Sequence, residues 1–129
     1  MASWQSFAES VLDCGDAVGA VIGSTEPVYG YSVLGMAGDV RKPTPQEMEA
    51  LVKRFETPNN GQYLVLAGQK FIQTTCTRDY LMGWDNAWGI AIARSNKIII
   101  IGRSGAGQDT GRLRDAVLRM ADGLRLSNS

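Results

Sequence analysis

The sequence predicts a single α+β domain in which helices cover the faces of a mostly antiparallel sheet. The chain has 129 residues, a usual length for one compact domain. Helical patterns lie near its beginning, in its middle and at its end, and the apolar segments between them are joined mainly by short turns. Parallel strands need crossover connections, so short turns favour antiparallel pairing.

The first helix is predicted over residues 3–13. Ser3 is a suitable N-cap, and apolar residues follow it at helical spacing before the pattern ends at Asp13, Cys14 and Gly15. The recurring apolar positions are Trp4, Phe7, Ala8 and Val11.

Two strands are predicted next, at Ala17–Ile22 and Val28–Val33. Both segments are rich in β-branched, aromatic or small residues, and Gly23–Pro27 between them is typical of a longer hairpin loop.

The middle of the chain predicts a helix followed by a second hairpin. Thr44 to Glu47 has the pattern of a capping box with proline in the first turn, so the helix should run to about Phe55. After a turn at Thr57–Gly61, the sequence predicts strands at Tyr63–Leu66 and Lys70–Thr75, with the reversal at Ala67-Gly68.

The last third predicts a third hairpin and a closing helix. Strands are expected at Trp88–Ala93 and Lys97–Ile101, and the second should be central because it is apolar on both faces. The closing helix is amphipathic. Its apolar positions are Leu113, Val117, Met120, Ala121 and Leu124, and its polar positions are Arg112, Asp115, Arg119 and Asp122.

Composition excludes several function classes. The chain has no histidine, which removes Ser/His/Asp and Cys/His nucleophile systems and histidine-containing zinc sites. Its 13 basic and 13 acidic residues give no excess charge for nucleic-acid binding. Asp79, Asp85 and Asp109 show no acid–base spacing, so we expect neither an enzyme nor a cofactor or metal.

The cysteines and the hydropathy pattern indicate the compartment. Cys14 and Cys76 are far apart and form no CxxC pair, which favours a reducing intracellular environment. The longest dense apolar run, 98–101, is far shorter than the roughly 20 residues that cross a bilayer, so we expect a soluble protein.

The glycine-rich segment 102–111 does not match a nucleotide-binding motif. A Walker loop requires Gly-Lys-Ser/Thr where this chain has Gly107-Gln108-Asp109, and Thr110 occupies the third glycine position of the dinucleotide fingerprint. The segment is interpreted as a strand-to-helix loop whose small residues would let another chain approach the backbone.

Charge is unevenly distributed along the chain. Residues 1–60 carry four basic and eight acidic groups, whereas residues 94–129 carry seven basic and three acidic groups. The basic end could bind an acidic protein or an anionic lipid headgroup, or it could be an ordinary solvated helix face.

Three segments together resemble profilin: Ser3-Trp4-Gln5, Leu66–Lys70 and Leu118–Leu124. The resemblance spans nearly the whole chain. It implies a sheet of about six or seven strands, with the N- and C-terminal helices packed together on one face and the shorter helix on the other. It also implies a monomeric, cytoplasmic, cytoskeleton-associated protein that binds monomeric actin and proline-rich proteins such as formins, and regulates filament assembly.

In the profilin family the two terminal helices form an aromatic groove for polyproline II segments. The resemblance places Trp4, Phe7, Tyr29 and Leu124 in this groove. A stripe of this kind is also compatible with a core face, although an indole at the start of a helix is hard to bury. Gly123 stands where many relatives have histidine or tyrosine, and Ser129 stands where some have a terminal tyrosine, so affinity could be reduced unless neighbours such as Met120 or Tyr31 compensate.

The resemblance places the actin surface on the later strands and the start of the last helix, where the local positive charge also lies. Lys70 aligns well with a basic family position, whereas the correspondence of the others depends on a loop, 104–111, that is longer than in relatives. The candidate residues are Lys70, Arg78, Arg94, Arg103, Gln108, Arg112 and Arg114.

Phosphoinositide binding would depend on the C-terminal arginines alone. Many plant-type profilins have a basic, glycine-rich stretch where this chain has 82–86, and we expect Trp84 or Trp88 to be partly exposed there. A different class also fits the sequence: a small α+β scaffold that binds a peptide or small ligand unrelated to actin, with its site at the backbone near Gly105.

Overall fold

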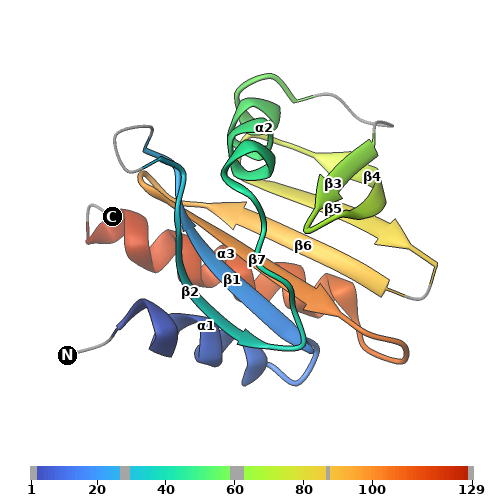
Figure 1. The fold of residues 1–129 in the computed structure, drawn as a ribbon. Coiled ribbons are helices and arrows are strands. Elements are labelled where there is room, and N and C mark those ends of the chain that lie inside the picture. The colour runs from blue at the N-terminus through green and yellow to red at the C-terminus, as the bar shows by residue number, and fades with distance from the viewer. Residues whose placement is uncertain (1–2, 27–29, 59–62, 87, 128–129) are drawn as a thin grey trace.

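A seven-stranded antiparallel sheet with helices on both faces forms the molecule. The computed structural model describes residues 3–26, 30–58, 63–86 and 88–127 (Figure 1). The elements in chain order are α1 (Trp4–Leu12), β1 (Gly19–Ser24), β2 (Val33–Gly38), α2 (Pro45–Glu56), β3 (Tyr63–Leu66), β4 (Gln69–Cys76), β5 (Tyr80–Asp85), β6 (Trp88–Arg94), β7 (Ile98–Ser104) and α3 (Thr110–Leu126).

The strands lie in the order β2-β1-β7-β6-β5-β4-β3, and every neighbouring pair is antiparallel. The α+β prediction is therefore confirmed. β7 lies between β1 and β6, and its residues Ile98–Ile101 are buried on both faces, as their apolar pattern predicts.

The two terminal helices lie on one face of the sheet, here called the terminal-helix face, and α2 lies on the other, the α2 face (Figure 1). On the terminal-helix face, Ala8 and Val11 of α1 share a buried cluster with Leu113 and Val117 of α3. On the α2 face, the buried residues of α2 are Met48, Leu51, Val52 and Phe55, which pack against the opposite side of the strands. The resemblance's arrangement of helices is confirmed.

Local signals set the helix beginnings. The Ser3 side chain accepts a hydrogen bond from the Ser6 backbone N–H (3.1 Å) at the start of α1. Thr44 and Glu47 form the predicted capping box at α2. Asp109 caps α3, which begins three residues before the first apolar position of the predicted pattern.

One predicted strand is misplaced, and one strand of the sheet is absent from the prediction. The strand expected at Val28–Val33 lies at Val33–Gly38 instead, because Gly30 and Tyr31 adopt positive φ angles of 70° and 53° that end any extended segment there. Residues 27–29 lie outside the described residues. β5 has no counterpart in the prediction, because its sequence YLMGWD carries little β-branched signal.

β7 is also longer than predicted. Gly102, Arg103 and Ser104, assigned from sequence to a glycine-rich loop, continue the strand and pair with β1 and β6. No helix in the described parts of the chain is long and apolar enough to cross a membrane.

Candidate functional site

A groove between α1 and α3 is the first candidate site. The helices run antiparallel, so the beginning of α1 lies near the end of α3 (Figure 1). The groove encloses about 580 Å³, and it is lined by Phe7, Ser10, Asp13, Cys14, Ala116, Arg119, Met120, Gly123, Leu124 and Ser127.

Close packing against β2 fixes α1 beside this groove. A Cβ atom on Gly35 would lie 2.6 Å from the carbonyl oxygen of Trp4, so only glycine lets the first turn of α1 approach this closely. The Gln5 side-chain oxygen accepts a hydrogen bond from the Met36 backbone N–H (3.2 Å), which ties the helix to the edge strand.

The predicted groove residues occupy different positions. Phe7 and Leu124 line the groove, whereas Trp4 is not among the lining residues. Trp4 and Phe7 are half-buried, and their ring centroids lie 5.3 Å apart with the ring planes inclined by 37°. Leu124 is only 6% exposed, so it contributes mainly to the core beneath these rings. Tyr29 lies outside the described residues. The geometry provides an aromatic pair at the surface, supported by a leucine below it.

Several lining residues are absent from the sequence prediction. Ser10 and Cys14 follow Phe7 in the sequence at helical spacing. On α3, the same spacing relates Ala116, Arg119 and Gly123 to one another. A helical-wheel projection that included the positions beside the core would have identified these residues. Met120 lines the groove as suggested. Tyr31 packs against the cluster on the α2 face, so it cannot compensate for Gly123.

The second candidate site is the part of the terminal-helix face that lies beyond α3, over β3, β4 and β5. Tyr63, Ile72 and Trp84 are cross-strand neighbours in one row. They are 56%, 55% and 38% exposed, and the neighbouring Val65 is 44% exposed. We call these four side chains the apolar row. Grouped apolar side chains on a protein surface mark interaction sites.

Two cationic groups lie on the same face of the sheet as the apolar row. The Lys70 ammonium lies 3.7 Å from the Tyr63 ring centroid. On α3, the Arg114 guanidinium lies 5.7 Å from the Tyr80 ring centroid and is bonded to Asp115 (3.1 Å). Lys70 therefore flanks an apolar surface that is absent from the sequence prediction, and Arg114 lies on the same face of the sheet, beside Tyr80.

The remaining predicted actin residues are dispersed. Arg94 and Arg103 point to the α2 face, where Arg94 lies over the Phe55 ring at 5.7 Å and Arg103 over the Trp88 ring at 4.0 Å. The Gln108 amide bonds to the backbone of Gly105 and Gly15, and so holds its own loop. Two further candidates, Arg112 and Arg78, are exposed, at the start of α3 and in the β4–β5 turn.

The carboxylate of Glu47, on the α2 face, has a lowered pKa. Burial raises the pKa of Glu47, but hydrogen bonds from the backbone N–H groups of Thr44, Gly68 and Ala67 outweigh burial and lower it below its ordinary value of 4.5. Its distances to these three nitrogens are 2.8, 3.1 and 2.9 Å. Glu47 therefore fixes the β3–β4 turn to the start of α2.

Comparison with known proteins gives one family. The profilin family model matches residues 2–129. No protein of curated function matches the chain.

Solved structures with the same fold include profilins from distant organisms. Schizosaccharomyces pombe profilin is 25% identical, with a TM-score of 0.85 over 98% of this chain and 100% of that one. Mouse profilin IIa, in complex with a double repeat from the FH1 domain of mDia1, is 18% identical, with a TM-score of 0.79 over 99% and 100%. LokiProfilin1, in complex with rabbit actin, is 14% identical, with a TM-score of 0.68 over 92% and 94%.

Proposed function

The chain belongs to the profilin family, and from this premise we propose that it binds monomeric actin and proline-rich segments and thereby regulates actin filament assembly, without covalent chemistry. The proposal rests on two exposed surfaces that lie on opposite sides of α3: the α1–α3 groove and the apolar row. A cytoplasmic, monomeric adaptor would use both.

Polyproline binding is supported by the Trp4–Phe7 pair. A polyproline II segment has no internal hydrogen bonds and a preformed shape, so it gains contact with aromatic rings at little entropic cost. The groove runs from Phe7, which the Trp4 ring contacts, to Met120 and Cys14, which gives a segment several residues long a surface to follow. Segments of the formin type are the proposed ligands. Gly123 leaves this part of the groove without a side chain, so we expect weaker binding than in relatives with an aromatic residue.

Actin binding is supported by the apolar row and the two cations beside it. Apolar side chains exposed by 38% to 56% have area left to bury against a partner, which is the dominant favourable contribution to association. Lys70 and Arg114 would meet acidic groups of the partner at the rim. Arg94 and Arg103 face the other side of the sheet and are not part of this proposed surface. Phosphoinositide binding stays an expectation from the resemblance.

A double dissociation with two tryptophan variants tests the proposal. Trp4→Ala should lose retention on a polyproline column while still delaying the polymerisation of purified actin. Trp84→Ala should be retained on the column but should lose much of its effect on polymerisation. Each variant is the matched control for the other, and thermal unfolding of both confirms that they fold.

The outcomes separate the two surfaces. A Trp4→Ala variant retained as well as the parent would remove the groove assignment. If the parent protein itself does not change the polymerisation lag at saturation, the actin proposal fails, and a ligand-binding scaffold becomes the better description.

A further inference from the structure

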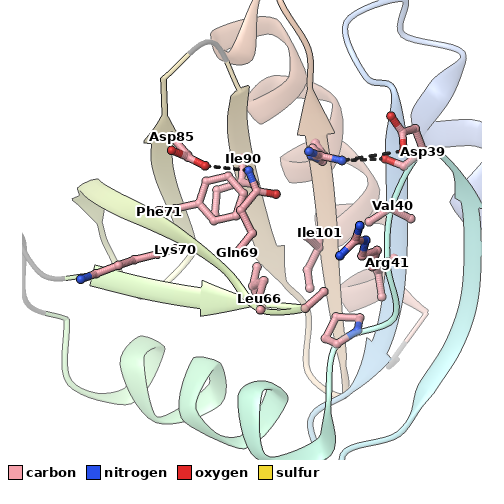
Figure 2. Close-up of a pocket in the computed structure, with 15 residues that line it drawn as sticks. Asp39, Val40, Arg41, Leu66, Gln69, Lys70, Phe71, Asp85, Ile90 and Ile101 are labelled. Carbon is pink, nitrogen blue, oxygen red and sulfur yellow. Dashed lines mark hydrogen bonds and ion pairs between the residues drawn. The ribbon is translucent and has the colours of Figure 1, made fainter.

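We propose a third binding site, on the α2 face, for a small organic anion with an apolar body. A cavity of about 670 Å³ lies between the sheet and the connection from β2 to α2, on the opposite side of the sheet from the apolar row (Figure 2). Pockets for small ligands typically have volumes of about 300–1,000 Å³. The proposal goes beyond actin and polyproline binding and does not depend on either.

Two fixed walls shape this cavity. One is the β2–α2 connection, residues 39–43, where the Asp39 backbone N–H donates to the Val18 carbonyl (2.6 Å) and the buried Pro43 leads into α2. The other is the β3–β4 turn, which Glu47 holds through the backbone N–H groups of Ala67 and Gly68. Because both walls are tied to the fold, the cavity is formed without a ligand.

The base of the cavity is apolar. Leu66, Phe71, Ile90 and Ile101 come from four different strands and line it together (Figure 2). Such a lining favours an apolar, ring-sized body over a small inorganic ion.

Two arginines supply positive charge on one side. Arg41 is exposed on the β2–α2 connection and lines the cavity, as labelled in Figure 2. Within the described ranges it has neither a hydrogen bond nor an ion pair, so its charge is available to a ligand. Arg103 is 17% exposed, and its Nη1 donates to the Asp39 carbonyl (3.3 Å) and lies 3.9 Å from the Asp39 carboxylate, which offsets its charge. Its buried Nε has no hydrogen-bond partner among the described residues.

The opposite end has different chemistry. Asp85 accepts a hydrogen bond from the Gln69 side-chain N–H (2.9 Å), as Figure 2 shows, so this carboxylate lies at the end of the cavity away from Arg41. The other carboxylate in the lining, Asp39, is paired with Arg103. The Lys70 ammonium is held over Tyr63 on the other face. Since Arg103 is paired with Asp39, the unpaired Arg41 would hold the anionic group of a ligand, with the apolar body of the ligand over the strands.

Two probes of one shape and opposite charge test this inference. We would titrate the ¹⁵N-labelled full chain with 2-naphthoate and, separately, with 2-naphthylmethylammonium, and follow backbone amide shifts by NMR. The naphthoate should shift amides in the segments 39–42 and 67–70, and the ammonium probe should leave them unchanged over the same range. Equal shifts with both probes, or naphthoate shifts confined to the α1–α3 groove, would overturn the proposal.

Arg41→Gln is the decisive variant because the side chain is exposed and its loss should not affect folding. Removing a charged hydrogen-bonding partner should weaken naphthoate binding about tenfold. Lys42→Gln is the matched control: it removes the same charge from the next residue, which does not line the cavity, and should change affinity by less than about twofold. Equal effects of the two substitutions would show general charge attraction in place of a site.

Discussion

Ile72→Asp tests the apolar row at its centre. Ile72 is 55% exposed and lies between Tyr63 and Trp84 on neighbouring strands. Full burial of an isoleucine side chain contributes about 1.5–3 kcal/mol, so roughly half of that remains to be gained from a partner. Placing a carboxylate in an apolar interface adds a desolvation cost of at least about 2 kcal/mol. Together these losses weaken actin binding about a hundredfold or more.

The same position predicts a small effect on folding. Less than half of the Ile72 side chain is buried, so the substitution should lower the free energy of unfolding by about 1–2 kcal/mol, including the lower β propensity of aspartate. Fluorescence titration with labelled monomeric actin measures the affinity, and denaturant unfolding measures the stability.

Leu126→Asp is the matched control. Leu126 is 90% exposed at the end of α3, outside the apolar row, and the substitution there should change neither actin affinity nor stability appreciably. Actin affinity within about threefold of the parent for Ile72→Asp, in a protein shown to be folded, would refute the assignment of this face.

Three further predictions concern stability. Glu47→Gln keeps an acceptor but cannot satisfy all three backbone N–H groups, so it should cost about 1–2 kcal/mol at pH 7, whereas Glu49→Gln should cost under about 0.5 kcal/mol. The pKa of Glu47 is lower in the folded than in the unfolded protein, so its ionised carboxylate stabilises the fold above its unfolded pKa near 4.5, and this stabilisation is lost as the pH falls through the folded pKa. Urea unfolding at pH 7 and pH 3 tests this: the free energies of unfolding of the parent and of Glu47→Gln should differ less at pH 3 than at pH 7. Gly123→Ala should raise the free energy of unfolding by about 0.5–1 kcal/mol, because a Cβ there meets open space on a helix, and a fall in the melting temperature would contradict this. Gly35→Ala should destabilise the protein and weaken polyproline retention together, because its Cβ would displace the first turn of α1, and column retention beside thermal unfolding tests both effects.

The helices, their beginnings and the central strand were readable from the sequence because their signals are local. The capping box at Thr44, the N-cap at Ser3 and the apolar run 98–101 depend on residues within a few positions of one another. β5 was not readable because its sequence has no β-branched residue, and β2 was not readable because its glycines are explained by contacts with distant segments. Gly35, for example, is required by the approach of α1.

The candidate sites, too, were predictable from the sequence only where their signals are local. Sequence identified Trp4, Phe7 and the excess of positive charge near the C-terminus, but it could not assign each arginine to a face of the sheet. Neighbouring strand residues alternate between faces, and a register shift between Gln73 and Thr75 changes that alternation. Only strand pairing brought Tyr63, Ile72 and Trp84 into one exposed row and directed Arg103 toward the cavity on the α2 face. The physical reason is that cross-strand neighbours come from segments that are distant in the sequence, which no local pattern connects.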